Sequence, residues 1–201
     1  GADVWSAFSD RLAALESKTT DLLRVGRQPA AYEDDEATAR LAKELGLSFE
    51  GRPPFGANDR ESARHLQDSL NRAKFLLAFS TSVSPAPYTH PTKEYITGRW
   101  TDALASGVTV VGQVPNTSTV REILWDGATI DIDHADARAG LAQVAEAASR
   151  WTPAQGEQQI RQALQHLDWR HRFVQLCEAM GEVPASLAAD CEAMRAQYVQ
   201  R

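Results

Sequence analysis

The sequence predicts an α/β fold: a Rossmann-like parallel sheet with helices on both faces, followed by a helical C-terminal extension. Up to about residue 150, short apolar runs of strand length alternate with longer segments of helical periodicity, which is typical of parallel strands joined by helices. Beyond that point only helical patterns remain. We therefore expect an N-terminal helix over residues 1–18, the α/β domain over 19–150 and helices over 151–201.

Periodicity and capping residues define the individual elements. Apolar side chains between Val4 and Leu15 fall on one helical stripe, which predicts an amphipathic first helix. Asn58 and Glu61 form a capping box, and Gly107 is suited to end a helix. Strands are expected over 21–26, 75–80, 108–112 and, as the last, 128–132; helices over 33–45, 58–72, 97–107, 120–124 and 135–150, and from 153, 167 and 184 onward.

Composition and charge narrow the classes of function. The chain has 201 residues, of which 43% are apolar, enough for a sizeable core. Its net charge of −6 disfavours nucleic-acid and anionic-membrane partners, because both require a basic face. No apolar run approaches the length of a membrane span. Cys177 and Cys191 lack metal-binding spacing, which indicates free thiols, a reducing compartment and a cytoplasmic protein.

The segment from Glu94 to Gly107 concentrates residues suited to binding a nucleotide. A helix that starts at Thr97-Gly98 leaves its first N–H groups free for phosphate, and Gly98 lets a ligand approach the backbone. Arg99 adds a planar fork of donors, and Asp102 can accept hydrogen bonds from ribose hydroxyls. Charged residues at a helix start also occur as a solvated face, so the local pattern leaves both interpretations open.

The stretch HPTKEYITGRWTDALASGVTVVG, from His90 to Gly112, resembles the donor-binding segment of GT-B glycosyltransferases, and most closely the group-1 branch that contains CgeB-like enzymes. These families carry a Glu, seven residues and a second Glu, followed by Ala-hydrophobic-Ala-x-Gly and an apolar strand. This chain has Glu94, seven residues and Asp102, followed by ALASG and the apolar run 108–111. Asp102 departs from the usual Glu and is one methylene shorter.

The resemblance implies a Rossmann-like donor half of an enzyme that transfers a sugar from a nucleotide-diphosphate sugar to a hydroxyl acceptor. It implies that Asp102 binds the ribose, that the backbone at Thr97, Gly98 and Arg99 binds the diphosphate, and that Glu94 lies near the donor sugar. It implies neither a cofactor nor a metal ion, so the site is expected to be metal-independent.

Loops that follow the predicted strands add further candidates. Gly26 and Arg27 end the first strand, where an arginine is either a diphosphate ligand or an exposed loop residue. The loop after the second strand holds Tyr88 and His90; we take His90, with Glu94, as a candidate catalytic residue, because an imidazole can carry protons near neutral pH. Such a histidine more often packs or caps a loop.

The pair Asp131 and Asp133 also permits a metal interpretation, because alternation along a strand puts both carboxylates on one face. Acidic residues at strand ends are common, and we therefore expect no metal site. The segment His166–Phe173 (HLDWRHRF) indicates a packed helix with a basic outer face, on which Trp169, Arg170 and Arg172 would contact another domain.

The length raises alternatives, because a complete GT-B enzyme has two Rossmann-like domains and this chain has room for one. We expect a missing N-terminal acceptor domain or a partner chain to complete it. A non-catalytic module that binds nucleotide sugars, or a GT-B-like epimerase or phosphorylase, are the alternative functions. The sequence contains no Gly-rich phosphate loop, no GxGxxG after the first strand and no GxSxG motif.

Overall fold

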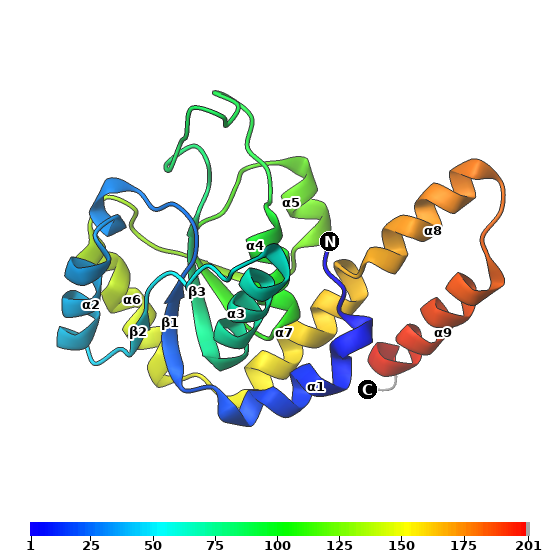
Figure 1. Cartoon of the computed structure of the whole chain (residues 1–201), viewed down its shortest axis with the longest axis horizontal. Coiled ribbons are helices and arrows are strands. Elements are labelled where there is room, and N and C mark those ends of the chain that lie inside the picture. The colour runs from blue at the N-terminus through cyan, green and yellow to red at the C-terminus, as the bar shows by residue number, and fades with distance from the viewer. Residues whose placement is uncertain (200–201) are drawn as a thin grey trace.

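The computed structural model describes residues 1–199 and shows the predicted α/β architecture (Figure 1). Five parallel strands form one sheet in the order β2-β1-β3-β4-β5. The strands are β1 (Thr20–Arg24), β2 (Phe49–Glu50), β3 (Ala73–Phe79), β4 (Thr109–Gln113) and β5 (Thr129–Asp131). The helices are α1 (Phe8–Ala13), α2 (Asp35–Glu44), α3 (Asp59–Arg72), α4 (Gly98–Ala105), α5 (Ser118–Ile123), α6 (Ala137–Ser149), α7 (Pro153–His166), α8 (Trp169–Met180) and α9 (Ala185–Val199).

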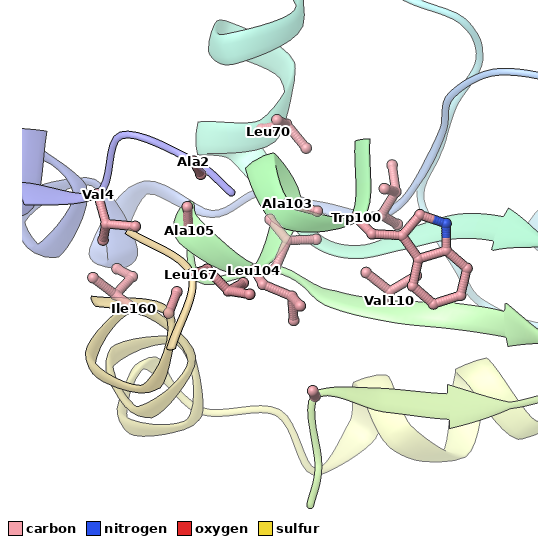
Figure 2. Close-up of a cluster of buried hydrophobic side chains, with 14 of the residues drawn as sticks. Ala2, Val4, Leu70, Trp100, Ala103, Leu104, Ala105, Val110, Ile160 and Leu167 are labelled. Atoms are coloured by element: carbon pink, nitrogen blue, oxygen red, sulfur yellow. The ribbon is translucent and has the colours of Figure 1, made fainter. Parts of the chain in front are cut away.

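Helices cover both faces of the sheet, because alternate strand residues point to opposite sides. Leu76 belongs to the core under α3, α4 and α7, whereas its neighbour Leu77 belongs to the core under α2 and α6. Figure 2 shows the first core, where Trp100 and Leu104 of α4 pack against Val110 of β4. This packing fixes the position of α4 relative to the strand ends.

The strand order places three loops around one opening. β1 pairs with β2 on one side and with β3 on the other, so the direction in which the sheet is wound reverses between β1 and β3. In open parallel sheets, ligands bind outside the carboxyl ends of the strands at such a reversal. The loops after β1, β2 and β3 therefore border the expected ligand site.

The sheet has one more strand than the sequence predicts. β2 consists only of Phe49 and Glu50, which pair with Leu22 and Leu23 of β1. Two residues give no detectable alternation of apolar and polar positions, so the prediction of four strands was wrong for a physical reason.

The first 18 residues also differ from the expected single helix. The chain forms a 3₁₀ turn at Trp5–Ala7, the short helix α1, and a second 3₁₀ turn at Ala14–Ser17. Ala7 precedes α1 and provides no side-chain cap. The three short pieces change direction along the core, which buries Val4, Phe8 and Leu15. Among residues 1–199, none of the helices combines the length and apolar character that a membrane crossing requires.

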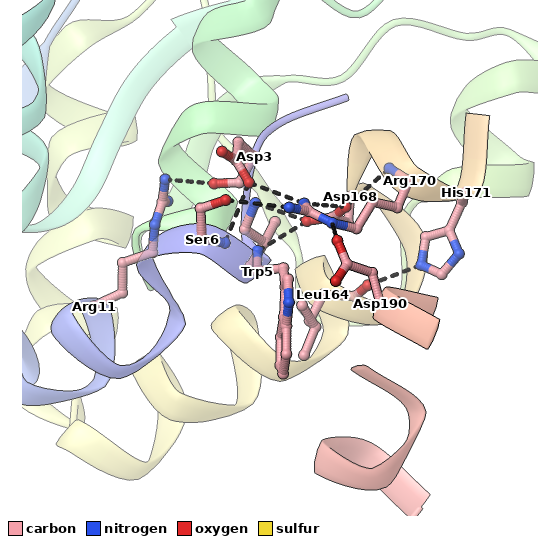
Figure 3. Close-up of polar contacts among 10 residues, drawn as sticks. Asp3, Trp5, Ser6, Arg11, Leu164, Asp168, Arg170, His171 and Asp190 are labelled. Atoms are coloured by element: carbon pink, nitrogen blue, oxygen red, sulfur yellow. Dashed lines mark hydrogen bonds and ion pairs between the residues drawn. The ribbon is translucent and has the colours of Figure 1, made fainter. Parts of the chain in front are cut away.

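A fully buried carboxylate joins the C-terminal helices to the N-terminal segment (Figure 3). Asp168 Oδ2 accepts hydrogen bonds from the backbone N–H groups of Val4 (2.9 Å) and Trp5 (2.8 Å). Its Oδ1 accepts one from the N–H of Arg170 at 2.9 Å, which caps α8. A bridge between Ala2 and Asp168 extends this contact along the backbone.

The Arg170 side chain is engaged within this same junction. Its guanidinium contacts Asp3 (3.1 Å), Asp168 (3.2 Å) and Asp190 (3.0 Å), and so links the N-terminal segment to α8 and α9. The basic outer face that the sequence predicts for this helix therefore excludes Arg170. Trp169 and Arg172 remain at the surface of α8 as residues that border a cavity.

A buried lysine just before β1, Lys18, makes the stability of the fold depend on pH. The Lys18 ammonium donates to the carbonyls of Leu70 (3.1 Å) and Ala73 (2.5 Å), and burial lowers its pKa to about 7. Lysine in the unfolded chain has a pKa of about 10.4. Between these values the unfolded chain binds a proton that the native protein does not, so stability rises with pH.

We expect Lys18 to raise the free energy of unfolding by at most about 1.4 kcal/mol per pH unit between pH 7 and 10. Below about pH 7 this pH dependence should vanish, because Lys18 is then protonated in both the native and the unfolded chain. The measurement is urea unfolding of the wild type and of Lys18→Met at several pH values in this range. The free energy of unfolding of the wild type should rise relative to that of the variant. Parallel pH profiles for the two proteins would contradict the prediction.

Candidate functional site

Three arginines from three different elements meet in a cavity of about 450 Å³ at the carboxyl ends of β1 and β2. Arg27 comes from the loop after β1, Arg52 from the loop after β2, and Arg99 from the first turn of α4. We call this space the arginine cavity. Its lining comprises Val25, Gly26, Arg27, Arg52, Pro53, Pro54, Phe55, Ser62, Ala63, Leu66, Tyr88 and Arg99.

Arg99 is held in place by the end of β1. Its Nη1 donates to the carbonyl of Val25 at 3.2 Å. Gly26 has a φ of +80°, and a Cβ on Gly26 would lie 2.0 Å from Arg99 Nη1, so a side chain at this position would displace the guanidinium. Burial, and after it the like charge of Arg27, lowers the pKa of Arg99. A guanidinium nevertheless keeps its charge in proteins, so Arg99 presents a fixed positive charge.

Arg27 and Arg52 add two positive charges that form no ion pair with a carboxylate of residues 1–199. The Arg27 guanidinium lies over the ring of Tyr88, 5.0 Å from its centroid, and its buried Nη1 has no hydrogen-bond partner within residues 1–199. Arg52 Nη2 reaches the carbonyl of Gly26 at 3.5 Å. None of the described residues that line the cavity is acidic. An anion with several oxygens would satisfy these donors, since guanidinium groups bind such oxygens in pairs.

Part of the lining of the arginine cavity is apolar, and we call this part the apolar wall. Pro53, Pro54 and Phe55 follow Arg52 directly, and Leu66 of α3 lines the same cavity. Phe55 and Tyr88 are each 82% exposed. Exposed aromatic rings beside a charged cavity provide flat surfaces on which a planar ring can stack.

Arg52 and Phe55 were not among the site residues predicted from the sequence. Their loop follows β2, and because β2 is too short to recognise, nothing marked that loop as lying at a carboxyl end. The signal that would have found them is the segment GRPPFG itself, in which arginine, two prolines and an aromatic residue precede a capped helix. Gly26, Arg27 and Arg99, which the sequence did predict, meet in the same cavity.

The tip of α4 is open beside this cavity. Thr97 occupies the N-cap position, but its side chain makes no capping bond, and its buried Oγ1 has no partner in the described chain. The helix begins at Gly98, which is exposed. A Cβ on Gly98 would meet only Asp102 Oδ2, at 3.8 Å, which is an ordinary contact. The protein itself therefore does not require glycine at this position.

Because the tip of α4 is open, Gly98→Ala tests whether a ligand binds there. Alanine is the better helix former and meets no clash, so the free energy of unfolding should stay equal or rise slightly. A ligand that approaches the backbone at this tip would collide with the new methyl group, and its affinity should fall by about tenfold. Urea unfolding and calorimetric titration of a nucleotide-diphosphate sugar measure the two effects. Unchanged affinity would show that no ligand approaches the tip of α4.

Asp102 lies one turn into α4 and is not among the residues that line the arginine cavity. Burial raises the pKa of its carboxyl group, and the positive charge of Arg11 opposes this shift. Arg11 itself donates to Ser106 Oγ at 3.2 Å, on the side of α4 that faces α1. The ribose contact of Asp102 stays a prediction.

Glu94 and His90 lie outside the arginine cavity. Glu94 accepts hydrogen bonds from Ser80 Oγ and from the N–H of Asn116 (3.0 Å), which ties together the loops after β3 and β4. Hydrogen bonding, chiefly from Ser80, lowers the pKa of the Glu94 carboxyl. His90 is exposed, and its Nδ1 accepts hydrogen bonds from the N–H of Thr92 (3.1 Å) and of Lys93 (3.0 Å).

Asp131 at the end of β5 and Asp133 just after it both bind backbone N–H groups. Asp131 Oδ1 accepts from the N–H of Val114 at 3.2 Å, and Asp133 Oδ1 accepts from those of Ala135 (2.8 Å) and Asp136 (3.0 Å). These backbone hydrogen bonds lower the pKa of Asp133. Within the described chain, no three His, Cys, Asp or Glu side chains gather as a metal ion would require.

No protein-family model and no curated protein matches this chain. The features of the chain that point to a function are therefore those of the arginine cavity: its position at the carboxyl ends of β1 and β2, its three positive charges and its apolar wall.

Proposed function

We propose that the chain is the donor-binding half of a glycosyltransferase, and that the arginine cavity holds the diphosphate of a nucleotide-diphosphate sugar. The observation that carries the proposal is the convergence of Arg27, Arg52 and Arg99 on one cavity whose described lining contains no carboxylate. Three guanidinium groups supply enough donors for the oxygens of two linked phosphates. The position outside the carboxyl ends of the strands is where parallel α/β sheets bind nucleotides.

The nucleobase and the phosphate oxygens would find further contacts beside the three guanidinium groups. The apolar wall at Pro53, Pro54 and Phe55 suits a nucleobase, which stacks on flat apolar surfaces. The open tip of α4 adds backbone N–H donors beside the diphosphate. In the transfer reaction the bond between the sugar and the diphosphate breaks, and the departing diphosphate gains negative charge. Arg27 and Arg99, already in place, would stabilise that charge.

A second function, a module that binds nucleotide sugars without transferring them, is favoured by one specific observation. Both candidate catalytic side chains already have hydrogen-bond partners in the protein: Glu94 binds Ser80 of its own loop and Asn116 of the loop after β4, and His90 binds the backbone of Thr92 and Lys93. A carboxyl group whose pKa is lowered stays ionised near neutral pH and does not donate a proton.

Titration with UDP-, GDP- and ADP-sugars, together with an assay for release of free nucleoside diphosphate, tests both functions. A glycosyltransferase half binds one of these donors and releases its diphosphate when a hydroxyl acceptor and any required partner chain are supplied. A binding module binds the donor but leaves it intact under all of these conditions. Failure of every donor to bind would contradict both proposals.

A further inference from the structure

A second cavity, of about 690 Å³, lies on the other side of the segment from Glu94 to Arg99. It is bordered by that segment, by α5 and by the start of α8, close to the N-terminal residue (Figure 1). The lining residues that matter for its chemistry are Glu94, Tyr95, Glu122, Trp169, Arg172 and Gln175. We call it the α5–α8 cavity; it shares no lining residue with the arginine cavity.

The charges in the α5–α8 cavity differ from those in the arginine cavity. Two carboxylates, Glu94 and Glu122, line it together with the guanidinium of Arg172 and the amino group of Gly1. The hydrogen bonds from Ser80 and Asn116 fix the Glu94 carboxylate, whereas the Glu122 side chain has no partner among residues 1–199. An anionic ligand would find no excess of positive charge here, whereas a neutral ligand with many hydroxyls would find both acceptors and donors.

Two aromatic rings complete this cavity. Tyr95 and Trp169 are each 45% exposed, so both leave part of their surface open to a ligand. The backbone N–H of Trp169 donates to the carbonyl of Ala2 at 3.0 Å, and its ring stacks on that of Phe173, with 6.4 Å between the ring centroids. A half-exposed indole offers an apolar face to the C–H groups of a sugar ring.

We infer that the α5–α8 cavity binds a neutral carbohydrate, with Trp169 or Tyr95 against the ring face and with Glu94, Glu122 and Arg172 on the hydroxyl groups. This inference does not depend on the proposed function. A role of this carbohydrate as the hydroxyl acceptor does rest on the proposed function, because an acceptor can receive a sugar only if a donor binds in the neighbouring arginine cavity.

The test is saturation-transfer difference NMR with the methyl glycosides of glucose, galactose, mannose and N-acetylglucosamine and with disaccharides of each. We expect at least one of these probes to bind with a dissociation constant below about 10 mM, within the range of weak specific ligands. Trp169→Ala and Glu122→Gln should each weaken it by about tenfold. Met180→Ala, at the exposed far end of α8, is the control and should leave the affinity unchanged.

Glu122 is exposed and has no partner in the described chain, so Glu122→Gln is expected to fold normally. This variant therefore still tests the inference if Trp169→Ala fails to fold. Absence of binding by every probe, or equal binding by the wild type and Glu122→Gln, would overturn the inference. Binding only of glucuronic acid or a sugar phosphate would overturn it as well. Arg27→Ala should abolish donor binding but not carbohydrate binding, which separates this inference from the proposed function.

Discussion

Replacing Arg99 with alanine is expected to weaken the binding of a nucleotide-diphosphate sugar by about 100-fold, which corresponds to about 2.8 kcal/mol. The side chain supplies charge-assisted donors in a partly buried cavity, and its position is fixed by Val25 and by the space above Gly26. The loss should appear in the dissociation constant measured by calorimetry. The free energy of unfolding should change little, because Arg99 makes one hydrogen bond to the protein.

Two further variants sharpen this experiment. Arg99→Lys keeps the charge but loses the planar fork, so its affinity should lie between those of the wild type and Arg99→Ala. Arg40 of α2 is 68% exposed in its side chain and pairs with Glu36, which makes Arg40→Ala a matched loss of one positive charge outside the cavity. Equal affinities for Arg99→Ala and Arg40→Ala would refute a specific role for Arg99.

The largest effect on stability is expected at Asp168. Asp168→Ala leaves the buried N–H groups of Val4 and Trp5 without acceptors, removes the cap of α8, and deprives Arg170 of one of its carboxylates. Breaking a buried charge pair of this kind costs about 3 to 5 kcal/mol. Urea unfolding should show this loss, and hydrogen exchange should show the early loss of protection at residues 2–5 and in α8.

The comparison variants separate the buried charge from surface pairing. Asp168→Asn retains one carbonyl oxygen and should lose less stability than Asp168→Ala. Asp190 also contacts Arg170, but its side chain is 50% exposed, so Asp190→Asn should change the free energy of unfolding by less than about 1 kcal/mol. A similar loss in Asp190→Asn and Asp168→Ala would contradict the central position of Asp168 in this junction.

Local signals predicted much of the fold because several helices carry their own boundaries. Asn58 caps α3 as predicted by accepting a hydrogen bond from the N–H of Glu61, although the Glu61 side chain binds the N–H of Ala57 and not that of Asn58. Thr152 forms the capping box of α7. Gly107 follows α4 with a φ of +72°. Each of these features depends on residues within four positions of one another, which is the range over which sequence patterns are informative.

Features that depend on distant residues escaped prediction. Asp168 contacts Val4 across 164 positions of sequence, and nothing near either residue indicates the pairing. Arg52 reaches the ligand site only because β2 lies beside β1 in the sheet. In the same way, Glu94 looks free in the sequence, but the folded loops bring Ser80 and Asn116 to its carboxylate.

The two cavities on either side of residues 94–99 give the proposed enzyme a consistent layout. One holds fixed positive charge beside an apolar wall, and the other holds carboxylates and exposed aromatic rings. A donor and a carbohydrate would therefore meet along the segment that leads into α4. The arrangement keeps the site for the charged ligand separate from the site for the neutral one.

The most direct test of this account is calorimetric titration of the protein with inorganic pyrophosphate, because this probe contains the diphosphate without a base or a sugar. The account predicts that pyrophosphate binds more tightly than orthophosphate, that added salt weakens its binding, and that Arg27→Ala combined with Arg99→Ala abolishes it. Absence of binding to the wild type, or undiminished binding to the double variant, would contradict the claim that the three arginines form a diphosphate site.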